Sequence, residues 1–293
     1  FLDPIAAEKK IVDHRTGKAF WQLVLLAMDG SLLKVLTRGG YHNVAPAFSR
    51  DGCSLFYTSY RHKNPNLMQM DLRTQRSVTL FGQPGMSVGA AADAAGNVVF
   101  THSPAGQRQS SLYCVDSGYA PARVRAVLSA QNHPLFYLSS HISAHVHPQN
   151  GSILFTSILR TSSRIYMLDA DGTISRRVVL PEVQQFSARF IPPDGSKFVF
   201  VARDPQSRQK DIFVAQLPQQ PTGGFATLMP ALTQNQGNNE NPDPSPDGQL
   251  LAFISTRAGK QEIYLSTLDG NHQRRITSNG PYETLAWGCI CRE

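Results

Sequence analysis

The sequence has no run of eighteen apolar residues and no closely spaced cysteine pair of the C-x-x-C type. The first absence excludes a membrane-spanning helix, and the second argues against a zinc knuckle or a thioredoxin-like motif. The four cysteines are Cys53, Cys114, Cys289 and Cys291. We predict that Cys53 and Cys114 are free thiols without a catalytic role. Cys289 and Cys291 follow the last predicted strand and are too close in sequence for an unstrained disulfide.

A concentrated charge of one sign is also missing. The net charge is +7, but the basic residues are scattered, and the pairs Arg176-Arg177 and Arg274-Arg275 fall at the outer edge of the repeat described below. Nucleic-acid binding favours a basic patch with interleaved aromatic residues on one face. We therefore expect no nucleic-acid partner and no direct membrane insertion.

Catalytic patterns are weak. Paired carboxylates for acid–base chemistry are absent from the predicted loops. Gly85-Met86-Ser87-Val88-Gly89 matches G-x-S-x-G literally, but that motif needs a strand before it and a helix after it, and Pro84 and a further strand stand there instead. We predict a non-enzymatic protein without a cofactor.

What the chain does contain is a repeat. Pro246-Asp247-Gly248 forms a turn signal, an apolar strand follows, and Asp269-Gly270 closes a second hairpin after another strand. The turn glycine recurs at Gly52, Gly96, Gly151, Gly195 and Gly248. A period of roughly 40–50 residues with four strands per unit is typical of propeller blades. A phenylalanine at one second-strand position also recurs, and we expect it to pack between blades; these residues are Phe56, Phe100, Phe155, Phe200 and Phe253.

The two ends complete the count of blades. Residues 9–37 supply the last three strands of a blade, and residues 284–288 supply a first strand without successors. Closing the ring removes exposed sheet edges. We predict one all-β domain over 1–293, a six-bladed β-propeller with four antiparallel strands per blade and a composite blade from both termini. The other blades span about 41–81, 86–129, 139–180, 186–233 and 240–278.

Particular residues of the repeat resemble a known family. Pro46-Ala47-Phe48-Ser49-Arg50-Asp51-Gly52, Ile263-Tyr264 and Arg274-Arg275-Ile276-Thr277 are similar to the repeat of TolB-type propellers, the periplasmic component of the Tol–Pal system. The resemblance covers nearly the whole chain. It implies a periplasmic location and a Pal-like peptidoglycan-associated lipoprotein, or another envelope protein, as partner. TolB carries an α/β domain before its propeller, so we expect either a trimmed chain or a propeller-only relative.

The loops that lead into the innermost strands are the candidate binding site. His42-Asn43-Val44-Ala45-Pro46 is similar to the loop at the channel mouth of TolB where Pal docks. These loops are rich in Asn, Ser, Gln, His and Tyr, whose side chains can hydrogen-bond to a peptide or a folded partner. The predicted partner-binding residues are His42, Asn43, Ala45, Ser87, His141, Gln185, Asn241 and Tyr282. We expect a monomer, because a closed ring has no need to dimerise.

Two alternatives stay open at this point. His141, His145 and His147 would share one face of a regular strand and could bind a metal, as in a polysaccharide-lyase-like propeller enzyme. His42, His141 and Gln185 could also converge from neighbouring blades. A sensory propeller that binds a small ligand is the second alternative.

Overall fold

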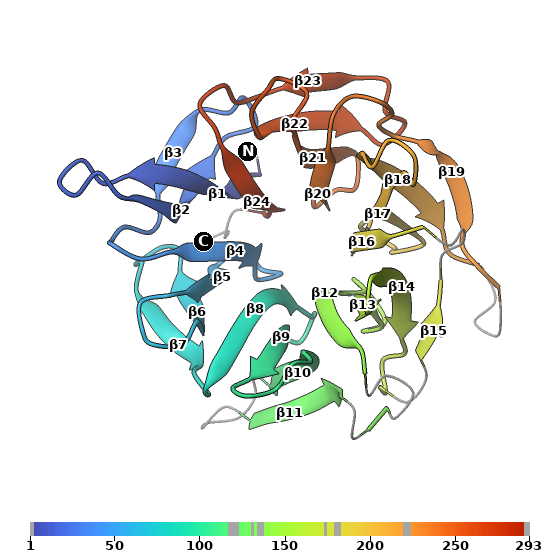
Figure 1. Ribbon diagram of the computed structural model, residues 1–293, viewed down its shortest axis with the longest axis horizontal. Helices are drawn as coiled ribbons and strands as arrows, with labels where there is room; N and C mark the ends of the chain where they lie inside the picture. Colours follow the sequence, from blue (N-terminus) through green and yellow to red (C-terminus); the bar gives the residue numbers. More distant parts are fainter. Residues whose placement is uncertain are drawn as a thin grey trace.

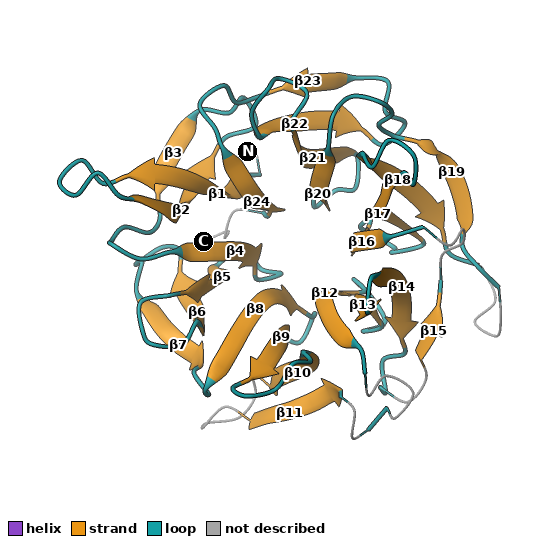
Figure 2. Ribbon diagram, in the orientation of Figure 1, coloured by secondary structure: helices purple, strands orange, loops and turns teal. Residues whose placement is uncertain are grey.

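The computed structural model describes residues 3–116, 123–129, 132–133, 138–172, 175–178, 183–218 and 224–289. Within these residues it contains strands and turns but no helix, and therefore no helix long and apolar enough to cross a membrane (Figure 2). The strands form six sheets of four, arranged in a ring around a central axis (Figure 1). The prediction of a six-bladed β-propeller is confirmed.

Five blades are continuous in sequence, and each starts with its innermost strand. Blade 1 consists of β4 (Asn43–Phe48), β5 (Ser54–Ser59), β6 (Asn66–Asp71) and β7 (Ser77–Phe81). Blade 2 consists of β8 (Gly85–Ala92), β9 (Val98–Pro104), β10 (Ser111–Asp116) and β11 (Arg123–Leu128). Blade 3 consists of β12 (Ser140–Val146), β13 (Ile153–Leu159), β14 (Ser162–Leu168) and β15 (Ser175–Arg177). Blade 4 consists of β16 (Gln185–Phe190), β17 (Lys197–Arg203), β18 (Lys210–Gln216) and β19 (Thr227–Ala231). Blade 5 consists of β20 (Asn239–Pro244), β21 (Leu250–Ser255), β22 (Glu262–Thr267) and β23 (Gln273–Arg275).

Blade 6 joins the two ends of the chain. Its inner strand β24 (Tyr282–Trp287) pairs antiparallel with β1 (Ile5–Val12), which is followed by β2 (Ala19–Leu26) and β3 (Leu32–Val35). The predicted composite blade is confirmed, although β1 begins at Ile5 rather than at residue 9. Ile5, Ala6 and Ala7 are fully buried, so this short apolar segment is part of the blade.

The core lies between neighbouring blades. The predicted phenylalanines Phe56, Phe100, Phe155, Phe200 and Phe253 are all buried, at most 3% exposed. Four of them share one second-strand position, but Phe56 is offset by one residue and Tyr57 takes that position in blade 1, so this part of the prediction is wrong. Three of them stack on an aromatic ring of the third strand, with centroids 5.7–5.8 Å apart in the Phe155–Tyr166, Phe200–Phe213 and Phe253–Tyr264 pairs. Each buried aromatic ring contributes about 1.5–3 kcal/mol of stability.

The inner strands share a β-bulge that the sequence did not reveal. The pairing register shifts after Val44, Val88, Ile142, Phe186 and Glu240. In blade 6 it shifts between Tyr282 and Leu285 of β24, which pair with Lys9 and Ala7. In blades 1 to 5 the residue after the shift has a positive φ of 50–65°, and these residues are Ala45, Gly89, Ser143, Ser187 and Asn241. A bulge inserts one residue and redirects the side chains that follow it. It therefore decides which residues of each inner strand face the channel.

The cysteines require one correction. Cys53 is disulfide-bonded, whereas we predicted a free thiol. Cys114 is a buried thiol, as predicted, and burial raises its pKa to about 12. The turn that carries Cys53 lies beside the C-terminal segment, since Gly52 packs against the carbonyl of Cys289. That proximity arises only from ring closure, which spacing along the chain does not show. Cys291 lies outside the described residues.

Candidate functional site in the central channel

The central channel is the candidate site, and its two ends differ. We call the end at which the inner strands begin the entry face, and the end at which they finish the exit face. The residues predicted to bind a partner lie where the inner strands begin. A cavity of about 550 Å³ occupies the channel from the bulges to the turns of the exit face.

Five of the eight predicted binding residues are buried between blades instead of lining the channel. Asn43, Ser87, His141, Gln185 and Tyr282 are at most 2% exposed. They occupy one repeat position, two residues before the bulge residue. The Asn43 amide donates to Gln22 Oε1 of blade 6 at 3.0 Å, and Gln185 Oε1 accepts from the N–H of Ile165 in blade 3 at 3.3 Å. The polar side chains of Asn43 and Gln185 thus make contacts between neighbouring blades.

His42 also has a structural role. Its Nδ1 accepts a hydrogen bond from the N–H of Trp21 at 3.1 Å, and its ring contacts Phe20 and Tyr60. Of the remaining predicted residues, Ala45 and Asn241 hold the positive φ of the bulge and line the cavity. Asn241 also donates to the carbonyl of Glu283 in blade 6 at 2.7 Å.

Ser87 and His102 form a hydrogen-bonded pair, with Oγ and Nδ1 2.9 Å apart. A serine nucleophile must be accessible and must sit at a strand-to-helix turn. Ser87 is instead fully buried within strand β8. The pair links β8 to β9, so the G-x-S-x-G match has no catalytic geometry.

The bulge separates the three histidines of the metal hypothesis. His141 precedes it and packs on Phe155 of its own blade, whereas His145 and His147 follow it and contact Phe190 of blade 4. The expectation that all three share a face is therefore wrong, because a bulge breaks the period of two. Across the described part of the chain, His, Cys, Asp and Glu side chains form no group of three that could hold a metal ion.

Each of the six inner strands contributes one equivalent residue to a ring inside the cavity, and the residues on the two sides of this ring differ in polarity. These positions lie two residues after the bulge residue, and they are occupied by Ala47, Ala91, His145, Arg189, Asp243 and Ala286. Three neighbouring blades thus present alanine, and the other three present polar or charged groups. This contrast was missed, because the positions can be aligned only once the bulges are known.

The polar side of the cavity is electrostatically coupled. Arg189 Nε lies 3.7 Å from Asp243 Oδ1, and Asp243 Oδ2 accepts from the N–H of Trp287 at 2.6 Å. Burial raises the pKa of Asp243 to about 6, against the opposing effects of Arg189 and Trp287. Burial, Arg189 and His147 together hold the pKa of His145 well below its usual 6.5, so His145 is neutral at pH 7.

A buried carboxyl group joins blades 6 and 1 at the level of the bulges. Glu8 is 3% exposed, and it accepts hydrogen bonds from the Thr284 hydroxyl at 2.7 Å and from the N–H of Ala45 at 3.2 Å. Burial raises its pKa from 4.5 to about 7, which the two hydrogen bonds only partly oppose; the charge of Glu283 adds to the rise. Glu8 is therefore the group at the ring closure that titrates near neutral pH.

We expect Glu8→Gln to change how stability depends on pH. Because the native pKa of about 7 lies above the unfolded value of 4.5, the stability that Glu8 contributes is present below pH 4.5 and is lost as the pH rises to 7. Between pH 5 and pH 8 the variant should gain up to about 3 kcal/mol relative to wild type. Urea unfolding at several pH values measures this, and parallel profiles for the two proteins would contradict the assignment.

The fold defines the class of protein as a six-bladed β-propeller. The family model described as the TolB beta propeller domain matches residues 9–223 and 139–288. The chain therefore belongs to the TolB beta propeller domain family.

Two curated relatives match parts of the chain. A protein described as a TolB homolog from Chlorobium luteolum is 27% identical over 191 residues, which cover 65% of this chain and 30% of that protein. An uncharacterised protein from Agrobacterium fabrum is 42% identical over 48 residues, 16% of each chain. The matched segments thus span less than a third of either relative.

Solved structures share the fold at low identity. TolB from Acinetobacter baumannii has a TM-score of 0.75 and 19% identity, covering 98% of this chain and 66% of that one. An oligogalacturonate lyase in complex with manganese has a TM-score of 0.59 and 16% identity, covering 92% of this chain and 77% of the lyase. These likenesses establish the propeller fold alone.

Proposed function

We propose that the protein is a non-enzymatic, periplasmic, monomeric propeller that docks a Pal-like peptidoglycan-associated lipoprotein on its entry face. Membership of the TolB propeller family supports this proposal. The observation that carries it is the composition of the entry face, where an arc of exposed apolar side chains adjoins an arc of hydrogen-bonded polar ones. Specific protein interfaces combine such apolar and polar areas.

The apolar arc belongs to blades 6, 1, 2 and 3. Its members lie where an inner strand begins or where the antiparallel second strand ends, which is the same end of the ring. They are Val12 (49% exposed), Tyr60 (39%), Met86 (44%), Leu138 (52%) and Leu159 (45%). Large apolar side chains gathered on one face of a soluble protein mark interaction sites.

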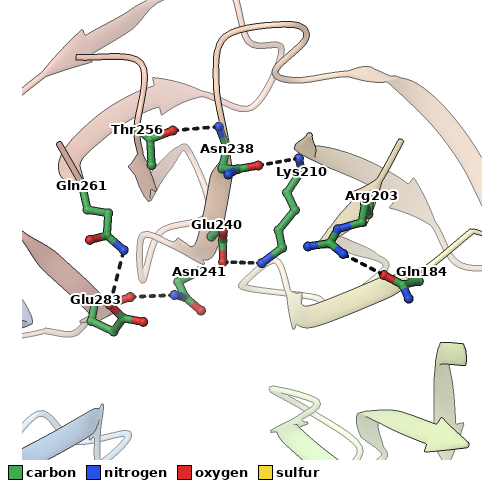
Figure 3. A network of polar contacts seen from close by, with 9 residues as sticks. All are labelled: Gln184, Arg203, Lys210, Asn238, Glu240, Asn241, Thr256, Gln261 and Glu283. Carbon is green, nitrogen blue, oxygen red and sulfur yellow. Dashed lines mark hydrogen bonds and ion pairs between the residues drawn. The ribbon is translucent and has the colours of Figure 1, made fainter. Parts of the chain in front are cut away.

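The polar arc belongs to blades 4, 5 and 6 (Figure 3). Lys210 Nζ lies 2.8 Å from Glu240 Oε2 of the next blade, and the Lys210 N–H donates to Asn238 Oδ1 at 3.1 Å. The Gln261 amide donates to Glu283 Oε2 at 3.3 Å. These side chains are held in place before any partner arrives, which lowers the entropy lost on binding.

The proposed location has independent support from the disulfide of Cys53. Disulfides persist in oxidising compartments such as the bacterial periplasm and are rare in the cytosol. A disulfide-bonded Cys53 in the turn after β4 fits the periplasmic location that the TolB family suggests.

The test is a calorimetric titration with the periplasmic domain of a Pal-like lipoprotein from the same organism, with and without chelator. We expect saturable binding that the chelator does not change. Leu159→Ala should weaken it about tenfold, as for an interface residue that contributes more than about 1 kcal/mol. Leu33→Ala is the matched control, because Leu33 is 53% exposed on the outermost strand of blade 6. Equal affinities for the two variants would contradict docking on the entry face.

A further inference from the structure

The cavity toward the exit face has no role in the docking proposal, which concerns the entry face. Its volume of about 550 Å³ is that of a small-molecule site. Its lining is mostly apolar and includes Phe48, Phe190, Trp287 and several prolines. Among the described lining residues the ionisable side chains of Asp, Glu, Lys and Arg are those of Arg50, Arg189 and Asp243, which give a net charge of +1.

Arg189 presents hydrogen-bond donors to the cavity. Within the described residues it donates one hydrogen bond, from Nη1 to the carbonyl of Ala188 at 3.2 Å, although a guanidinium carries five N–H donors. Its contact with Asp243 is long, at 3.7 Å from Nε to Oδ1. The side chain is 27% exposed even though it lies on an inner strand, so its other donors face the space of the channel.

His145 adds a second donor beside it. Its Nδ1 accepts the N–H of Phe190 at 3.2 Å, so the neutral ring carries its proton on Nε2. Arg189 and His145 occupy equivalent positions of adjacent inner strands. An arginine beside a neutral N–H donor is an arrangement that binds a carboxylate.

The opposite side of the same ring leaves room for an apolar group. Ala47, Ala91 and Ala286 occupy the three positions that complete the ring, and each ends at a methyl group. We propose that the cavity binds a small monocarboxylate with an apolar body, its carboxylate on Arg189 and His145 and its body against the alanine side. This site is separate from the entry face and does not depend on the proposed docking function.

The proposal predicts that removal of the Asp243 charge strengthens binding of the carboxylate. The Asp243 carboxylate competes with a ligand carboxylate for Arg189 and repels it. Asp243→Asn keeps an oxygen to accept the N–H of Trp287 while removing the charge. We expect Asp243→Asn to bind the carboxylate several-fold more tightly than wild type, and Arg189→Gln to bind it about tenfold more weakly.

The probes are phenylacetate and its neutral isostere phenylacetamide, titrated into the whole chain by calorimetry. We expect phenylacetate to bind with a dissociation constant of about 1 mM, in line with its few heavy atoms, and phenylacetamide to bind at least about tenfold more weakly. Ala47→Leu, which fills the apolar side without touching a charged group, should abolish phenylacetate binding. Arg125→Gln is the matched control, because Arg125 is 58% exposed on the outermost strand of blade 2.

Circular dichroism and thermal unfolding establish that each variant is folded before it is titrated. If Arg189→Gln fails to fold, Asp243→Asn and Ala47→Leu still decide the matter, since they predict changes of opposite sign. Equal binding of acid and amide, an unchanged or weaker affinity in Asp243→Asn, or an absence of saturable phenylacetate binding to wild type would each overturn the proposal.

Discussion

Gly248→Ala should lower the free energy of unfolding by about 2–4 kcal/mol. Gly248 has a φ of +69°, and a methyl group built on it would overlap the carbonyl oxygen of Pro192 in blade 4. The left-handed backbone costs alanine about 1 kcal/mol, and the overlap forces blades 4 and 5 apart at additional cost. Since a domain is stable by only about 5–15 kcal/mol, this one methyl group should remove a large part of the total.

Gly259→Ala in the same blade is the matched control. Gly259 also has a positive φ, +84°, but a methyl group there would meet nothing within 4 Å. Its cost should be the backbone term alone, about 1 kcal/mol. Urea unfolding of both variants measures the difference. Equal losses would show that the close approach of blades 4 and 5 at Gly248 does not constrain the ring.

Removal of residues 281–293 should abolish the cooperative fold. This deletion takes away β24, the inner strand of blade 6, and with it Tyr282, Leu285 and Trp287, each at most 7% exposed. Loss of three large buried side chains removes about 5–9 kcal/mol, comparable to the whole stability of a domain. The deletion also leaves β1 as an unpaired edge facing the channel, which favours aggregation.

Glu283→Ala is the control for this deletion, because Glu283 is the exposed side chain of the same strand. It should change stability by less than about 0.5 kcal/mol, as is usual for surface sites. Thermal unfolding followed by circular dichroism compares the two. A truncated chain that unfolds cooperatively near the wild-type temperature would contradict the role of β24 in closing the ring.

The repeat could be predicted from the sequence because aspartate and glycine recur at its turns. Asp51, Asp194 and Asp247 each accept the N–H two residues later, at 3.0–3.1 Å, as turn aspartates do. Two constraints require a glycine after these aspartates. The backbone has a positive φ, and the neighbouring blade leaves no room for a Cβ atom. Gly195 packs against the imidazole of His147 in the same way that Gly248 packs against Pro192.

The binding residues were harder to predict, because the bulge has no single residue type. Alanine, glycine, serine and asparagine all occupy its left-handed position. Counted as a regular strand, His141 and His145 share a face, whereas the inserted residue places them on different sides. The sequence holds one signal of the bulge. A polar residue recurs two positions before it in the five continuous blades, from Asn43 to Asn239, and the structure shows that these residues are buried.

The entry face and the cavity toward the exit face also differ in the side chains that they present. The entry face offers exposed leucine, methionine and tyrosine side chains beside an ordered polar network, which suits a folded partner. The cavity toward the exit face offers Arg189, His145 and three alanines in a small volume. Asn241 lies at the boundary, since it lines the cavity and also bonds to Glu283 of the entry face.

The most direct test of docking on the entry face is a hydrogen-exchange footprint of the propeller with and without the Pal-like periplasmic domain. We expect protection in the loops at residues 60–65, 84–86, 138–140 and 159–162, which carry most of the apolar arc. The exit-face turns at residues 49–53 and 245–249 should exchange at the same rate in both states. Protection confined to the exit face or to the outermost strands, with the entry loops unchanged, would contradict the account.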